Sequence, residues 1–143
     1  VSHLPLTSIE KVNYTDLNFL NYKALIFTSA NAVKFLDTNK FNKKIKCFCV
    51  GNFTEKKARS LGFQNTISAE GNVSNLKELI LQNFDPKEGP ILYVSGEKIT
   101  IELDKQLLSE GYNIKRVINY FLIINPKNIQ VFRFVVFSYN NIS

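Results

Sequence analysis

Residues 24–31, Ala-Leu-Ile-Phe-Thr-Ser-Ala-Asn, form a short apolar run that ends in small polar residues, and a helix-like segment follows. Three later segments repeat this order: Cys47-Phe48-Cys49-Val50 before Gly51-Asn52-Phe53-Thr54, Thr66-Ile67-Ser68-Ala69 before Glu70-Gly71-Asn72-Val73-Ser74, and Ile91-Leu92-Tyr93-Val94 before Ser95-Gly96. A repeated order of strand, polar turn and helix is typical of a parallel sheet, in which ligands bind where the strands end. The sequence therefore predicts an α/β protein whose functional edge carries these four turns.

The apolar periodicity predicts five strands that alternate with helices, as in a flavodoxin-like open parallel sheet with helices on both faces. The expected strands are residues 24–27, 46–50, 66–68, 91–94 and 114–123, and the expected helices include residues 30–36 and 54–61. Thr54 and Ser74 are expected as helix N-caps, and Gly62 as the residue that ends a helix. In the helix before Gly111, the residues expected to face inward are Leu103, Leu107 and Leu108.

Both ends of the chain are expected to lie outside this sheet. Residues 1–13 carry Pro5 and no helical pattern, which indicates an extended connector, and residues 16–22 could form a short helix. Beyond the fifth strand, residues 131–137 form a further apolar run. Because the chain has no methionine and stops soon after that run, we expect a piece of a larger protein.

Bulk composition predicts one folded domain and no membrane segment. The 143 residues are 45% apolar and 21% charged, close to the averages for globular proteins. No apolar run approaches the roughly 20 residues that span a bilayer, and no secretion signal is visible, so we expect a cytoplasmic protein. Cys47 and Cys49 are expected to be buried free thiols, and His3 is the only histidine, so no metal site is predicted.

The net charge of +6 has two interpretations. The chain is rich in Asn, Ile and Lys, a composition that an AT-biased genome produces without selection for function. Alternatively, the positive charge attracts a small polyanionic ligand. No nucleic-acid recognition motif accompanies it, so no nucleic-acid partner is expected.

The turns carry groups that hold anions. Helix N-termini present backbone N–H groups, and small residues let a ligand approach the main chain. The polar side chains at these turns are Thr28, Ser29, Asn52, Thr54, Asn72, Ser74 and Ser95. Any one of them could serve only as an N-cap, but four such turns on one edge favour a crevice for a ligand with several anionic groups.

The sequence lacks the motifs of several common enzyme classes. It has no glycine-rich dinucleotide fingerprint, no phosphate-binding loop of the nucleoside triphosphatases and no nucleophile elbow. Glu70 and Glu97 are the only carboxylates expected near the strand ends. A reaction at this edge would use little side-chain acid–base chemistry, or would use Tyr120.

At these turns the chain resembles the uroporphyrinogen-III synthases, which close the tetrapyrrole ring. The resemblance covers residues 4–120 and rests on these segments in this order: Ile26-Phe27-Thr28-Ser29-Ala30-Asn31-Ala32-Val33, Val50-Gly51-Asn52-Phe53-Thr54, Leu61-Gly62-Phe63, Ala69-Glu70-Gly71-Asn72 with Leu76, Leu92-Tyr93-Val94-Ser95-Gly96, Leu103, Leu107, Gly111 and Val117 to Tyr120. The family has two α/β domains joined by a pair of connectors. The resemblance therefore implies a connector at 1–13, an α/β domain at 14–121, and a return connector with the first strand of a largely absent partner domain at 122–143.

The resemblance also implies a reaction. The family converts hydroxymethylbilane to uroporphyrinogen III, with loss of water and inversion of the last pyrrole ring, and uses no metal or organic cofactor. The substrate carries eight carboxylates, which backbone amides in the cleft between the domains would hold. A monomeric enzyme is expected, in which catalysis is largely orientation of the substrate.

Site residues follow position by position from the resemblance. Tyr120 matches the tyrosine that would assist loss of the hydroxyl, as a hydrogen-bond donor. The expected substrate-binding residues are Thr28, Ser29, Gly51, Asn52, Thr54, Gly71, Asn72, Ser74, Ser95, Gly96 and Ser138. Ser95 and Phe121 stand where arginine is common in the family, so two positive groups are missing.

Two other functions remain open at the level of sequence. A flavodoxin-like module could bind the phosphate of FMN at the Thr28-Ser29 turn without catalysis, although the basic charge does not favour it. A regulatory receiver module would need an Asp at the end of a central strand, where this chain has small neutral residues.

Overall fold

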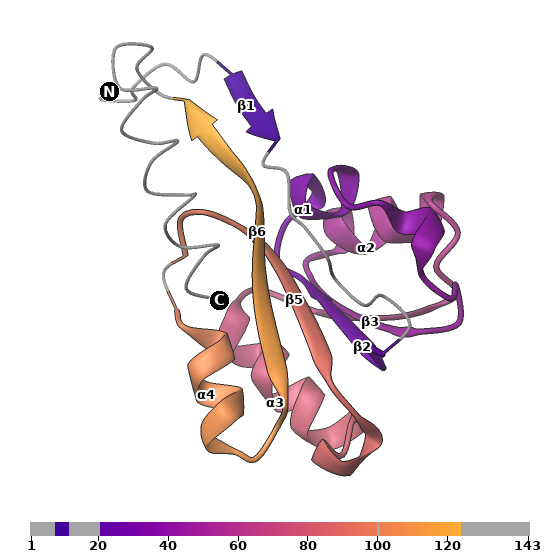
Figure 1. Ribbon diagram of the computed structural model, residues 1–143, viewed down its shortest axis with the longest axis vertical. Helices are drawn as coiled ribbons and strands as arrows, with labels where there is room; N and C mark the ends of the chain where they lie inside the picture. Colours follow the sequence, from indigo (N-terminus) through magenta and orange to yellow (C-terminus); the bar gives the residue numbers. More distant parts are fainter. Residues whose placement is uncertain (1–7, 12–20, 100, 124–143) are drawn as a thin grey trace.

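The computed structural model describes residues 8–11, 21–99 and 101–123, which form a six-stranded sheet flanked by helices (Figure 1). The strands are β1 (Ser8–Lys11), β2 (Ala24–Phe27), β3 (Lys46–Val50), β4 (Asn65–Ala69), β5 (Ile91–Gly96) and β6 (Ile114–Ile123). The helices are α1 (Ala30–Lys34), α2 (Asn52–Ser60), α3 (Val73–Asn83) and α4 (Leu103–Ser109), with short 3-10 turns η1 (Thr38–Lys40) and η2 (Pro86–Glu88). The predicted α/β class is confirmed.

The predicted count of five strands is wrong for the described residues, because Ser8–Lys11 adds a sixth. This strand runs antiparallel to β6, with Ser8 opposite Ile123 and Lys11 opposite Tyr120. Its sequence, Ser-Ile-Glu-Lys, has a single apolar residue and no strand-like alternation to reveal it. In Figure 1, β1 and the end of β6 extend together beyond the body of the sheet.

The flavodoxin-like strand order is also corrected. Across the sheet the order is β1-β6-β5-β2-β3-β4, so the parallel strands, numbered along the chain, run 3-2-1-4-5 and not 2-1-3-4-5. The composition of two strands explains the difference. β4 is polar and half-exposed, which suits an edge, whereas Cys47, Phe48 and Cys49 of β3 are fully buried and need an internal position.

Helices cover both faces of the sheet, as predicted. Alternate strand residues point to opposite faces. Leu25 and Phe27 of β2 join a core with residues of α1 and α2, and Ala24 and Ile26 join a second core with residues of α3 and α4. Figure 1 shows the two helix pairs on opposite sides of the strands.

Local predictions are confirmed at several elements and wrong at one inward face. The bounds of β2, β3 and β6 are as predicted, and Gly62 has a φ of 103° after α2, as a helix-ending glycine should. Leu108, however, is 52% exposed, whereas Leu103 and Leu107 are buried. Residues four apart share a helix face, so Leu108 lies off the face that Leu103 and Leu107 bury.

Three predicted features lie outside the described residues. They are residues 16–20 of the possible first helix, the apolar run at 131–137, and Ser138. Among the helices that the structure describes, none has the length and apolar character needed to cross a membrane.

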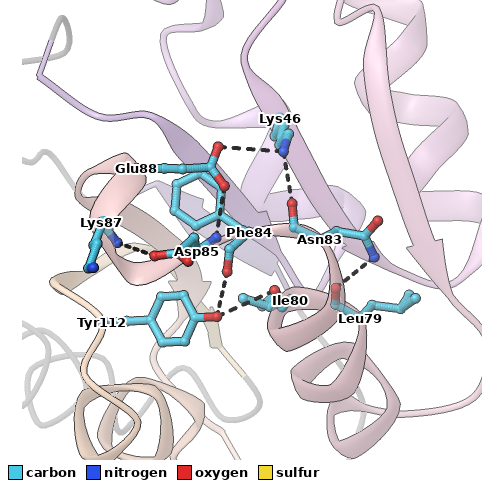
Figure 2. Close-up of polar contacts among 9 residues, drawn as sticks. All are labelled: Lys46, Leu79, Ile80, Asn83, Phe84, Asp85, Lys87, Glu88 and Tyr112. Carbon is cyan, nitrogen blue, oxygen red and sulfur yellow. Dashed lines mark hydrogen bonds and ion pairs between the residues drawn. The ribbon is translucent and has the colours of Figure 1, made fainter.

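A cluster of polar contacts lies at the amino end of the sheet, where the parallel strands begin (Figure 2). The Tyr112 hydroxyl donates to the carbonyl of Phe84 at 2.5 Å, just past the end of α3, and is 3.5 Å from that of Ile80. Lys46 donates to the carbonyl of Asn83 at 2.8 Å and pairs with Glu88 at 3.6 Å. These contacts tie the end of α3 to the starts of β3 and β6.

Tyr112→Phe is expected to lower the free energy of unfolding by about 1–3 kcal/mol. The substitution keeps the ring but leaves the buried Phe84 carbonyl without its hydroxyl donor, and an unmade buried hydrogen bond costs about that much. Urea denaturation of the chain measures the loss. Glu88→Gln, which weakens a half-exposed ion pair, should cost less than about 1 kcal/mol. Equal losses in the two variants would contradict the larger contribution expected from the Tyr112 hydrogen bond.

Cys47 and Cys49 are free and buried in the core against α1 and α2, as predicted. Burial raises the pKa of Cys49 to about 12, with a smaller contribution from Glu55. Burial also raises the pKa of Cys47, and the Cys49 thiol adds to the effect. The folded protein therefore favours both thiols in their neutral form.

This preference predicts a loss of stability in alkaline solution. In the unfolded chain the thiols ionise near pH 9, whereas in the folded chain they stay protonated, so their stabilising contribution is complete below pH 9 and is lost as pH rises. Each thiol should lower the free energy of unfolding by up to about 1.4 kcal/mol per pH unit above that point. Denaturation midpoints between pH 7 and 10.5 test this. The double variant Cys47→Ala/Cys49→Ala should have a smaller slope, and an unchanged slope would contradict the prediction.

Candidate functional site

Five parallel strands end at the same edge of the sheet, which we call the carboxyl end. β2, β3 and β4 stop at Phe27, Val50 and Ala69, each before one of the small polar turns. Ser95 and Gly96 instead form the last two residues of β5, which is two residues longer than the predicted strand 91–94. Neighbouring strands lie about 4.8 Å apart, so the turns form a row. The predicted alignment of the four turns on one edge is therefore present.

The centre of this row is the switch point of the sheet. From β2 the chain proceeds outward through β3 and β4, then returns to β5 on the other side of β2. Helices α1 and α2 cover one face and α3 and α4 the other, so the turns after β2 and β5 leave in opposite directions. Crevices that bind ligands in open α/β sheets lie at such points.

Ser29 and Tyr120 meet at the switch point, although 91 positions separate them. The Ser29 Oγ and Tyr120 hydroxyl oxygens are 2.7 Å apart, and either group can donate. Ser29 is also the N-cap of α1, where its Oγ accepts from the Ala32 N–H at 3.3 Å. The Tyr120 ring is half-buried, with its centroid 6.1 Å from that of Phe35.

Gly96, at the end of β5, lies directly against Tyr120. A Cβ built on Gly96 would lie 2.6 Å from Cζ, 2.8 Å from Cε2 and 2.9 Å from the hydroxyl oxygen of Tyr120. Only a residue without a side chain fits beside the ring. The structure therefore brings three of the predicted site residues, Ser29, Gly96 and Tyr120, into one contact group.

The turns after β3 and β4 each contain a glycine with positive φ. Gly51 has a φ of 84° and Gly71 a φ of 94°, and the Gly51 N–H donates to the Ala69 carbonyl at 2.9 Å. A Cβ on Gly51 would meet no atom within 4 Å, so the space above this turn is open. The hydrogen bond from Gly51 to Ala69 links the ends of β3 and β4.

The N-cap predictions for these helices are wrong by two or three residues. Helix α2 begins at Asn52 with Gly51 as its N-cap, and Thr54 is a buried residue of the first turn. Helix α3 has Asn72 as its N-cap, with the Asn72 Oδ1 accepting from the Asn75 N–H at 3.0 Å, and Ser74 lies within the helix. The turn glycines set these starts, because their left-handed conformation places the helix entry next to them.

Ser95 points into the protein. It is fully buried, its hydroxyl donates to the Gly96 carbonyl at 3.0 Å, and it accepts from Nε of Arg116 at 2.7 Å. Thr28 follows β2 and is half-buried, and Ser138 lies outside the described residues. The side chains of Ser29, Asn72 and Ser95 thus make hydrogen bonds within the protein.

The start of α2 presents backbone donors at this edge of the sheet. In α2 the first intrahelical bond runs from the Glu55 N–H to the Gly51 carbonyl, so the N–H groups of Asn52, Phe53 and Thr54 have no acceptor within the helix. The positive end of the helix dipole adds to their attraction for an anion. Within residues 8–11, 21–99 and 101–123, no group of three His, Cys, Asp or Glu side chains could hold a metal ion.

Sequence reasoning missed two buried polar residues of β6. Arg116 is 3% exposed and binds the end of β5, and Asn119 is fully buried and donates from Nδ2 to the Ala32 carbonyl of α1 at 2.8 Å. A signal existed for Arg116. It stands between Ile114 and Ile118 on one face of an apolar strand, where a charged residue requires an explanation.

The fold defines an open, mostly parallel α/β protein, with the contact group of Ser29, Gly96 and Tyr120 at the carboxyl end of its strands. A family model, described as uroporphyrinogen-III synthase HemD, matches residues 1–133. The chain belongs to that family, and the resemblance noted in the sequence is confirmed. The family match does not favour the FMN-binding or receiver alternatives.

A solved relative supports the fold. The chain is similar to uroporphyrinogen-III synthetase from Helicobacter pylori 26695, with 22% sequence identity and a TM-score of 0.59. The match covers 82% of this chain and 53% of the Helicobacter protein, so the chain spans about half of that relative. The comparison with curated proteins found no significant match.

Proposed function

We propose that the protein carrying this chain is a uroporphyrinogen-III synthase, a cyclising lyase that converts hydroxymethylbilane to uroporphyrinogen III. Membership of the family over residues 1–133 supports the reaction. The observation that carries it in the structure is the pairing of the Ser29 and Tyr120 hydroxyl groups at the switch point, beside turns rich in backbone donors. Such an arrangement suits a substrate with many carboxylates and a single leaving hydroxyl.

In this proposal the turns after β3 and β4 hold carboxylates of the substrate. The donors are the N–H groups of the first turns of α2 and α3, with Gly51 and Gly71 allowing close approach, and Asn52, Thr54, Asn72 and Ser74 lie in the same turns. An anion there gains both hydrogen bonds and the favourable end of the helix dipole. Thr28 and Ser29 extend the surface to the switch point.

Tyr120 assists the departure of the hydroxyl group. Its O–H donates a hydrogen bond to the leaving oxygen as the C–O bond breaks. Without substrate, the Tyr120 hydroxyl group is hydrogen-bonded to the Ser29 hydroxyl group instead. The charge that develops on the oxygen is stabilised by a donor that is already in place. Ser95 and Gly96 shape the turn that holds the ring. The proposal requires no acid or base besides Tyr120 in this contact group.

The remaining features of the proposal concern the whole protein. Residues 1–13 and 122–143 would join this α/β domain, residues 14–121, to a partner domain that supplies the second wall of the cleft, including Ser138. The antiparallel pairing of Ser8–Lys11 with the end of β6 supports two connectors that leave the domain side by side. We further propose a cytoplasmic monomer that binds no nucleic acid and needs no cofactor.

A coupled assay tests the reaction. The full-length protein is supplied with hydroxymethylbilane generated in situ, and the products are separated as uroporphyrin isomers after oxidation. The III isomer is expected. The spontaneous I isomer alone, from folded protein, would reject the proposed function. The chain of residues 1–143 alone should give only the I isomer, since it supplies one wall of the cleft.

A further inference from the structure

Arg116 is a charged residue that is almost fully buried, and its contacts explain its position. It lies on the same face of β6 as Ile114 and Ile118 and is opposite Tyr93 of β5, whose ring centroid is 6.0 Å from the guanidinium carbon. The guanidinium donates to three consecutive residues. Nε donates to the Ser95 Oγ at 2.7 Å, and Nη2 donates to the carbonyls of Gly96 at 2.8 Å and Glu97 at 3.2 Å.

Ser95 and Gly96 form the irregular end of β5, and Glu97 follows it directly. Up to Ser95, opposite Ile118, the ladder with β6 is regular, but Gly96 is opposite Tyr120, so one residue of β6 is skipped. A bulge of this kind interrupts the ladder and re-aims the strand. Two carbonyls at the interruption accept from Arg116, and the planar fork of a guanidinium fixes their relative direction. Arg116 thereby determines the shape of this turn.

The same turn determines where Tyr120 lies. Gly96 is packed against the ring, and the Glu97 N–H donates to the Tyr120 carbonyl at 3.0 Å. The Tyr120 hydroxyl oxygen is 2.7 Å from the Ser29 Oγ. A shift of Gly96 toward β6 would push the ring away from Ser29, because no free space separates Gly96 from the ring.

We propose that Arg116 is a positioning residue: by holding Ser95, Gly96 and Glu97, it sets the place of the Tyr120 ring and directs its hydroxyl group to Ser29. Arg116 itself is buried, so in this proposal it acts through the residues that it holds. The importance of this position for a reaction rests on the proposed function, whereas the position itself can be measured without substrate.

The first experiment observes Tyr120 directly. The protein is labelled with ¹³Cζ-tyrosine, and the Tyr120 signal is identified by its absence in Tyr120→Phe. Arg116→Met should move or broaden the Tyr120 signal, and Arg116→Lys should move it less, since an ammonium can reach one of the three acceptors but not all. Tyr112→Phe, a destabilising substitution at the amino end, should leave the signal in place. This control separates positioning from a general loss of stability.

The second experiment concerns turnover. Arg116→Met should lower kcat about 10-fold with KM within about twofold of its original value, as a misplaced catalytic group does. In the Tyr120→Phe background it should lower kcat no further. An unmoved Tyr120 signal in folded Arg116→Met would overturn the proposal, and if that variant does not fold, an unmoved signal in Arg116→Lys would do so. If the original protein forms only the I isomer, the proposed function fails while the labelled signal still decides the role of Arg116.

Discussion

Tyr120→Phe is expected to lower kcat for formation of the III isomer by about 100-fold while the protein stays folded. The ring and its contacts with Phe35 and Gly96 are kept, and only the hydroxyl that meets Ser29 at 2.7 Å is lost. Removal of one preorganised donor to a developing oxyanion typically costs a factor of this size. The coupled assay gives kcat, and thermal denaturation confirms the fold.

Ser29→Ala is the matched partner of this substitution. It keeps the Tyr120 hydroxyl but removes its protein partner and the N-cap of α1, so a smaller loss of kcat, about 10-fold, is expected. When Ser29→Ala is added to Tyr120→Phe, the further loss of kcat should nearly vanish, because the two hydroxyl groups act as one unit. Full activity in Tyr120→Phe would contradict the role given to the hydroxyl.

Gly96→Ala should be the most damaging single-methyl addition at the carboxyl end. The new Cβ would lie 2.6–2.9 Å from three atoms of Tyr120, closer than packed atoms come, so the ring must leave its place beside Ser29. We expect a loss of about 1–3 kcal/mol in the free energy of unfolding, typical of overpacking, and a loss of activity at least as large as in Tyr120→Phe. Urea denaturation and the coupled assay measure the two effects.

The control for Gly96→Ala removes the ring. In a Tyr120→Ala background the same methyl group has space, so its cost in stability should fall below about 0.5 kcal/mol. Gly96 does not have a positive φ, which excludes backbone strain as the cause. An equal cost in the two backgrounds would show that the damage does not arise from Tyr120.

Local features of the fold could be predicted because they depend on neighbouring residues. Short apolar runs bounded by small polar residues define β2 and β3 to the residue, and Gly62 ends α2 as its conformational freedom allows. The order of the strands depends on which strands pair, and no local pattern contains it. The polarity of β4 was the available indication that it lies at an edge.

The candidate site likewise combines local features, which the sequence indicates, with contacts between distant residues, which it does not. The turns are local and were found, but the meeting of Ser29 with Tyr120 joins residues 91 positions apart and needs the completed sheet. The contact of Gly96 with Tyr120 depends on a skipped residue in the ladder, which a regular strand pattern does not indicate. Asn72 and Ser74 are both good N-caps by type, and the backbone of Gly71 decided between them.

The most direct test of substrate binding at the carboxyl end of the sheet compares the responses of its two ends to a ligand. Uroporphyrinogen III is titrated into ¹⁵N-labelled full-length protein, and amide signals are followed by NMR. We expect signals of residues 28–30, 51–54, 71–74 and 96–97 to move on binding, while those around Tyr112 at the amino end stay in place. Shifts concentrated around Tyr112, with residues 51–54 and 71–74 unchanged, would contradict it.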